Sequence, residues 1–138
     1  MDAEFLWFNQ VPNGAAPDWK QKWFTSAAFR HAIMQARRAM ISTATVLEVK
    51  MVVYGRRGPR ALVLADDMLR LPIFEVTPPS QADIDAAFGA FVAFGNGSGH
   101  PASLNYGDLF AYALAKVRNL PLLFKGNDFA ETDIEPVA

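Results

Sequence analysis

Three acidic residues, Glu48, Asp108 and Asp128, stand where a chain of alternating strands and helices would bring them to one place. Glu48 follows an expected strand by about one helical turn, and Asp108 falls in the first turn of an expected helix. Asp128 comes soon after the last apolar stretch. In open parallel sheets, ligands bind beyond the carboxyl ends of the strands, and all three positions fit that edge. Because clustered carboxylates repel one another without a cation, the sequence predicts a Mg²⁺ or Mn²⁺ site, as used in phosphoryl chemistry.

Each acid also has an alternative, purely local role. The run TVLE, which ends at Glu48, matches a capping box in which the carboxylate accepts a hydrogen bond from the Thr45 amide. Asp108 stands three residues after Asn105, where an acid favours the helix dipole. Asp128 lies in a Lys-Gly-Asn-Asp turn, where aspartate commonly bonds to nearby backbone. If all three roles were local, the chain would be a structural α/β protein. Their shared edge favours the metal site instead.

The composition limits the class of protein. The chain is 51% hydrophobic and 20% charged, which is typical of one globular domain. It has no cysteine, which excludes disulfides, cysteine-ligated zinc and a thiol nucleophile. No apolar run approaches the ~20 residues of a membrane helix, and the start carries Asp2 and Glu4 rather than a basic leader. A cytoplasmic protein that contacts no membrane is expected. The net charge of −1 argues against binding nucleic acid over the whole surface.

Short apolar strands that alternate with helices predict a parallel sheet covered on both faces. Strands are expected at 39–43, 72–77 and 122–124, and helices from about 26 to 38, at 45–54, after the Gly58-Pro59 break, at 80–94 and from 105 to 119. The expected division is an atypical segment at 1–25, a domain at 26–134 and a frayed tail at 135–138.

Two further features have more than one interpretation. Phe88, Phe91 and Phe94 share a helix face, either as core residues or as a hydrophobic groove for a partner helix. His100 precedes a proline and is expected to be a loop residue rather than a catalytic base.

Three segments resemble the PIN-domain ribonucleases, in particular the VapC toxins of bacterial toxin–antitoxin pairs. They are ISTATVLEV, HPASLNYGD and GDLFAYALAKVRNLPLLFKGNDFAETD, and the likeness covers roughly residues 29–134. The resemblance implies an α/β three-layer PIN-like domain, with a central parallel sheet flanked by helices. It implies a Mg²⁺-dependent endoribonuclease that hydrolyses an RNA phosphodiester, a small antitoxin protein as partner, and a homodimer. It assigns the metal site to Glu48, Asp108 and Asp128, while Ser42 or Thr43 either hydrogen-bonds within that site or serves in packing or capping.

The resemblance fails at the start of the chain. The family opens with a strand that ends in an aspartate followed by a small hydroxyl residue, and that aspartate is a principal metal ligand. Neither Asp2 nor Asp18 has that context. We hypothesise that the first strand is missing or replaced, through a frameshift or a misplaced start codon. The expected enzyme is therefore weak or inactive. The alternative function is a degenerate PIN-like module that binds an antitoxin or a twin subunit without cleaving RNA.

Overall fold

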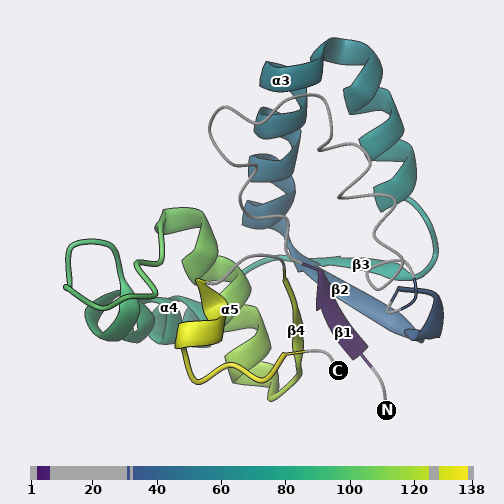
Figure 1. Cartoon of the computed structure of the whole chain (residues 1–138). Helices are drawn as coiled ribbons and strands as arrows, with labels where there is room; N and C mark the ends of the chain where they lie inside the picture. Colours follow the sequence, from purple (N-terminus) through teal and green to yellow (C-terminus); the bar gives the residue numbers. More distant parts are fainter. Residues whose placement is uncertain (1–2, 7–30, 32, 125–127, 137–138) are drawn as a thin grey trace.

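A computed structural model describes residues 3–6, 31, 33–124 and 128–136. Its strands form a four-stranded parallel sheet in the order β3-β2-β1-β4 (Figure 1). The strands are β1 (Ala3–Leu6), β2 (Arg38–Ser42), β3 (Phe74–Thr77) and β4 (Leu122–Leu123). The helices are α3 (Thr43–Leu69), α4 (Gln81–Phe94), α5 (Tyr106–Arg118) and the short 3₁₀ helix η1 (Phe129–Glu131).

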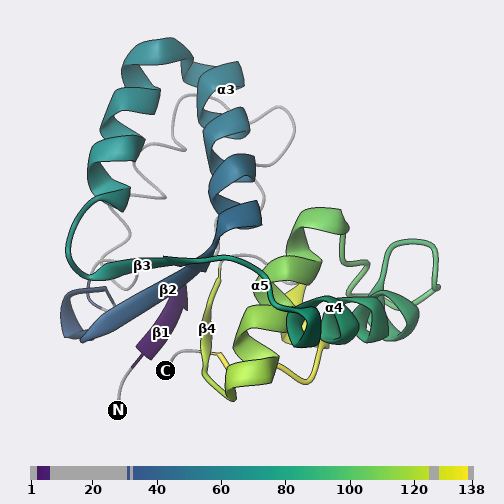
Figure 2. The same cartoon turned by 180° about the vertical axis from the view of Figure 1, so that it is seen from behind.

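The expected α/β architecture is confirmed. Helix α3 and the α4–α5 pair lie on different sides of the sheet, as the two opposite views show (Figures 1 and 2). Because all the pairings are parallel, the carboxyl ends of the strands lie at one edge of the sheet. Helix α3 starts at that edge, directly after β2.

A strand is present at the start of the chain, where the sequence indicated none. β1 is an inner strand, and its Phe5 lies opposite Met40 of β2 and Leu122 of β4. It ends at Leu6, so it carries no carboxylate at the edge of the sheet where α3 begins. Asp2, Asp18 and most of the helix expected from residue 26 lie outside the described residues; residues 33–35 are helical.

Helix α3 begins earlier and runs further than the sequence predicted. The buried Ser42 is its N-cap, and the Ser42 hydroxyl accepts a hydrogen bond from the Ala44 amide at 3.3 Å. The helix passes Gly55 and kinks at Gly58, whose φ of 75° favours glycine, directly before Pro59. The break at Gly58-Pro59 is therefore confirmed, but the helix end at Gly55 is not. The kink divides α3 into two arms (Figure 1).

Helices α4 and α5 start next to residues 80 and 105, where the sequence predicted helices, and each begins at a polar cap. Ser80 caps α4 and Asn105 caps α5, each through a capping box with an aspartate three residues later. α5 ends at Asn119, which takes the left-handed conformation with φ of 51°. Six residues of α5 besides Asp108 are buried, so this helix forms the centre of the core: Leu109, Ala111, Tyr112, Ala113, Leu114 and Ala115.

The segment after η1 packs against α5 and pairs with β4, so the expected fraying is wrong for residues 135 and 136. Ile134 is buried, and the Leu122 amide donates to the Glu135 carbonyl at 2.8 Å. The Asp133 carboxylate accepts hydrogen bonds from the Tyr112 hydroxyl at 2.7 Å and from the Lys116 ammonium at 2.6 Å. Burial and this carboxylate together raise the pKa of Tyr112, which therefore stays a hydrogen-bond donor.

A buried ion pair joins the start of α4 to the end of α5. Arg118 Nη1 lies 2.8 Å from Asp83 Oδ1, and the Asp83 side chain is 3% exposed. Burial alone would raise the pKa of Asp83, but hydrogen bonds from Arg118 and from the Ser80 amide lower it below the ordinary 3.8. A carboxyl whose pKa is lowered by folding stabilises the folded state once it is ionised.

Asp83→Asn is expected to lower the free energy of unfolding by about 2 kcal/mol at pH 7, because hydrogen bonds to charged groups are worth about 1.5–3 kcal/mol. The loss in the free energy of unfolding, relative to the parent protein, should be largest above pH ~4. It should shrink as pH falls through the lowered pKa of Asp83. Urea unfolding at several pH values measures it.

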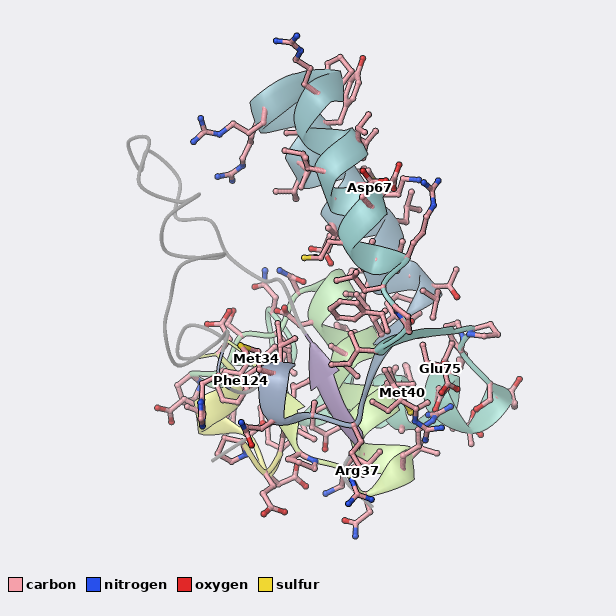
Figure 3. All side chains as sticks on the ribbon, turned by 90° about the vertical axis from the view of Figure 1, so that its right-hand side faces the viewer. Met34, Arg37, Met40, Asp67, Glu75 and Phe124 are labelled. Carbon is pink, nitrogen blue, oxygen red and sulfur yellow. The ribbon has the colours of Figure 1, made fainter. Side chains whose placement is uncertain are left out.

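Asp67→Asn is the matched control. Asp67 pairs with Arg70 on an exposed face of the protruding α3 arm (Figure 3). Exposed pairs contribute about 0–1 kcal/mol, so this variant should unfold almost like the parent. Equal losses in the two variants would contradict the assigned role of Asp83.

Candidate metal centre

The structure brings the Glu48 carboxylate against the first turn of α5. Glu48 lies in the second turn of α3, and Gly107 precedes Asp108 in α5. A Cβ built on Gly107 would lie 2.6 Å from Glu48 Cδ and 2.7 Å from Glu48 Oε1, closer than real Cβ contacts. Any side chain at this point would require the Glu48 carboxylate to move. Two segments far apart in the sequence thus meet at the Glu48 carboxylate, next to the residue that precedes Asp108.

Glu48 does not have the capping role that was its alternative. Ser42 is the N-cap of α3, and Thr45 already lies inside the helix, so the capping box expected for TVLE does not form. Burial raises the pKa of Glu48, and its Oε2 is buried without a hydrogen-bond partner. Buried charges in proteins are normally paired or coordinate a metal. The unpartnered oxygen fits a divalent cation, whose preferred ligands are carboxylate oxygens.

Asp108 does take part in the capping box of its helix, whose N-cap is Asn105. The Asp108 side chain is fully buried, and its Oδ2 accepts a hydrogen bond from the Asn105 amide at 2.8 Å. In return, Asn105 Oδ1 accepts from the Asp108 amide at 2.9 Å. The first of these bonds orients the Asp108 carboxylate, and the second holds the Asn105 side chain against the start of the helix. A carboxylate offers about four lone-pair sites, so this cap does not exclude a metal role.

Asp128 is half-buried and directly precedes η1, without capping it through its side chain. Within residues 31, 33–124 and 128–136, no group of three or more Asp, Glu or His side chains is arranged to hold a metal ion. The structure therefore places Glu48 beside the start of α5 but does not gather Asp128 with these two acids. The metal role of Asp128 stays a prediction.

Two buried hydroxyls at the same edge of the sheet were missed by sequence reasoning. Thr45 Oγ1 and Thr77 Oγ1 have no hydrogen-bond partner. Among the described residues, these two atoms and Glu48 Oε2 are the only buried side-chain nitrogen or oxygen atoms without a partner. Thr77 ends β3 opposite Ser42, and Thr45 follows Ser42 in α3. The three unpartnered atoms thus belong to segments at the carboxyl ends of β2 and β3. The spacing of three residues between Thr45 and Glu48 indicates that they share a helix face. The same spacing also matches a capping box, which is why the sequence alone does not reveal the shared site.

The aromatic helix face divides into two parts. Phe94 packs against the core and contacts the rings of His100, at 5.0 Å, and Tyr112, at 5.9 Å. Phe88 and Phe91 are instead exposed and line an apolar pocket of about 360 Å³ between α4 and α5. The core interpretation is therefore confirmed for Phe94 and wrong for the other two. His100 is a loop residue whose Nδ1 accepts from the Ala102 amide at 3.1 Å, as expected.

The contact between Glu48 and Gly107 can be tested by alanine substitution in the absence of metal. Gly89→Ala is the control, because a Cβ at Gly89 in α4 meets no atom within 4 Å. It should stabilise the protein by about 0.5–1 kcal/mol, the usual gain of alanine over glycine in a helix. Gly107→Ala should show no gain or a loss, because the new methyl group displaces the buried carboxylate. Thermal and urea unfolding in EDTA measure both; equal gains would contradict the contact.

Comparisons with known proteins agree with this fold and with these segments. The model of the PIN-domain family matches residues 24–135, which includes all the proposed site residues and excludes β1. Ribonuclease VapC28 of Mycobacterium tuberculosis is 39% identical over 110 residues, covering 80% of this chain and 83% of that protein. Ribonuclease VapC42 of the same species is 36% identical over 107 residues, covering 78% and 82%.

A solved structure is similar over almost the whole chain. The crystal structure of Mycobacterium tuberculosis VapC20, described as a sarcin-ricin-loop-cleaving toxin, matches with a TM-score of 0.69 and 17% identity. The match covers 97% of this chain and 98% of that one, and at this identity it shows the fold. None of the described helices is long and apolar enough to cross a membrane. From the family match and the identity to its relatives, the chain belongs to the PIN-domain family and, within it, to the VapC ribonucleases.

Proposed function

We propose that this chain is a divalent-metal-dependent endoribonuclease, the toxin of a toxin–antitoxin pair, with a weakened metal centre. Glu48, Asp108 and Asp128 are its metal-site residues, and Mg²⁺ or Mn²⁺ is the cofactor. The observation that carries this proposal is the buried Glu48 oxygen without a partner, next to the fixed start of α5. A negative group in that position is expected to attract a cation.

The residues present suit hydrolysis of an RNA phosphodiester. A bound divalent cation supplies Lewis-acid polarisation of a phosphoryl oxygen and lowers the pKa of a water. Glu48 and Asp108 would hold the cation. The Asn105 amide orients the Asp108 carboxylate through one hydrogen bond. Gly107 lets the Glu48 carboxylate approach the backbone of α5. Both groups are thus positioned before any ligand binds, which reduces the reorganisation that catalysis requires.

The centre is weakened because β1 ends in Leu6 rather than in an acid. Mg²⁺ keeps several waters and can bind through only one or two carboxylates, so the remaining acids can still hold an ion. The loss of one direct ligand should nevertheless misplace the attacking water. A misplacement of about 1 Å can reduce the rate about 100-fold. The same observation favours the alternative, a degenerate module that binds its partner without cleaving RNA.

The proposed partners follow from membership in the VapC family. They are an RNA substrate, a small antitoxin protein and a second copy of the chain, in the cytoplasm. Charge supports transient rather than extended RNA binding, because the chain has a net charge of −1.

Glu48→Gln should abolish metal-dependent cleavage of structured RNA in Mg²⁺ or Mn²⁺, because it removes the charge that holds the cation and keeps the shape of the side chain. Asp108→Asn should do the same, and EDTA should stop the parent protein. Glu75→Gln is the matched control: Glu75 lies on β3 in an exposed pair with Arg38 and should leave cleavage unchanged. Cleavage that persists in Glu48→Gln, or in EDTA, would contradict the proposed function.

The expected loss of activity is measured by comparing the cleavage rate of this chain with that of a relative on the same RNA substrate. This chain should cleave at least about 100-fold more slowly than ribonuclease VapC28 at equal protein and metal concentrations. No cleavage, together with metal-induced thermal stabilisation, would support the degenerate module. Equal rates would show that the acid absent from β1 is not needed.

A further inference from the structure

Thr45 carries a buried hydroxyl that the fold does not use. Its residue is 1% exposed, and Oγ1 has no hydrogen-bond partner. A threonine inside a helix usually donates to a backbone carbonyl one turn earlier, which would satisfy the hydroxyl at once. Thr45 does not do so, and the capping of α3 is already supplied by Ser42. Leaving such a group unsatisfied costs about 1–3 kcal/mol, so an unused hydroxyl at this position calls for an explanation.

Thr45 lies on the same face of α3 as Glu48. Residues three apart are neighbours on a helix surface, and Val49 completes the buried stripe of this arm. Glu48 Oε2 is likewise buried and unpartnered. Two adjacent polar groups without partners on one buried face would impose two separate penalties. A single polar ligand that contacts both groups would remove both penalties.

The hydrogen-bonding chemistry of the Glu48 carboxylate and the Thr45 hydroxyl determines which ligand they can bind together. A carboxylate only accepts hydrogen bonds, whereas a hydroxyl can donate or accept. Water can donate to both, and a buried water typically needs two to four polar partners. Mg²⁺ gives up its waters reluctantly and keeps several of them in protein sites. A hydrated cation at Glu48 would therefore present water to a neighbouring hydroxyl.

We propose that the Thr45 hydroxyl is a positioning group of the metal centre, which holds a water in the hydration shell of the cation bound by Glu48. This inference rests on the proposed metal site and adds a residue to it. Thr45 acts through the water, so its removal should weaken metal binding without abolishing it. Groups that support a metal site in this way typically contribute 10–100-fold to metal affinity.

The test measures the dissociation constant of Mn²⁺ and of Mg²⁺ by calorimetry, and the metal-induced shift in Tm, without RNA. Thr45→Val keeps the shape of the side chain but removes the hydroxyl, and should weaken binding about 10-fold. Thr45→Ser keeps the hydroxyl and should bind like the parent protein. Tyr54→Phe removes a hydroxyl from an exposed residue of the same helix, away from the proposed site, and should change nothing.

Three results would overturn the inference. If Thr45→Val binds metal like the parent, the hydroxyl is only a buried unsatisfied group, and the metal-free variant should have a raised Tm. If Thr45→Ser loses as much affinity as Thr45→Val, or if Thr45→Val fails to fold while Thr45→Ser folds and loses affinity, the methyl packing is responsible.

Glu48→Gln separates this inference from the proposed function. Loss of metal binding in Glu48→Gln with unchanged binding in Thr45→Val would refute the role of Thr45 alone. A parent protein that binds neither cation would refute both.

Discussion

The half-buried Glu48 carboxylate, whose Oε2 is fully buried against the start of a helix, is the constraint on which the site depends. Glu48 reaches Gly107 because α3 begins directly after β2, and because α5 presents a residue without a side chain at that point. Burial raises the pKa of this carboxyl, and no donor satisfies its Oε2. The folded chain therefore holds a negative group in a position that it does not itself neutralise. We propose that a divalent cation neutralises this group, and the VapC relatives are ribonucleases by name.

The stabilising interactions lie away from that position. Asp83 and Arg118 join α4 to α5, and Asp133 joins the segment after η1 to Tyr112 of α5. In both places a buried or partly buried carboxylate has donors that lower its pKa. Glu48 differs from these two residues. A carboxylate that supports the fold has hydrogen-bond donors, whereas the carboxylate at the proposed site has an oxygen without one. Frustrated groups of this kind concentrate at functional sites.

Much of this arrangement could be predicted from local sequence. Ser80 and Asn105 begin α4 and α5 as their capping signals indicate, and the Gly58-Pro59 kink follows from backbone sterics. The expectation that Glu48 and Asp108 lie at one edge of the sheet followed from parallel-sheet topology, whereas the approach of Glu48 to Gly107 is visible only in the structure. The start of α3 was misplaced because Ser42 and Thr45 are both good caps, and the pairing of β2 with its neighbours decides between them. β1 was missed because an inner strand of only four residues has no periodic signal of its own. Unpartnered hydroxyls are invisible in sequence, since they depend on what surrounds them.

Anomalous diffraction from crystals grown with Mn²⁺ tests the central claim most directly. The account predicts a manganese peak within direct or water-mediated contact of the Glu48 and Asp108 carboxylates, at the carboxyl edge of the sheet. A well-ordered structure in saturating Mn²⁺ with no peak there, and with Glu48 Oε2 paired to a protein donor instead, would contradict it.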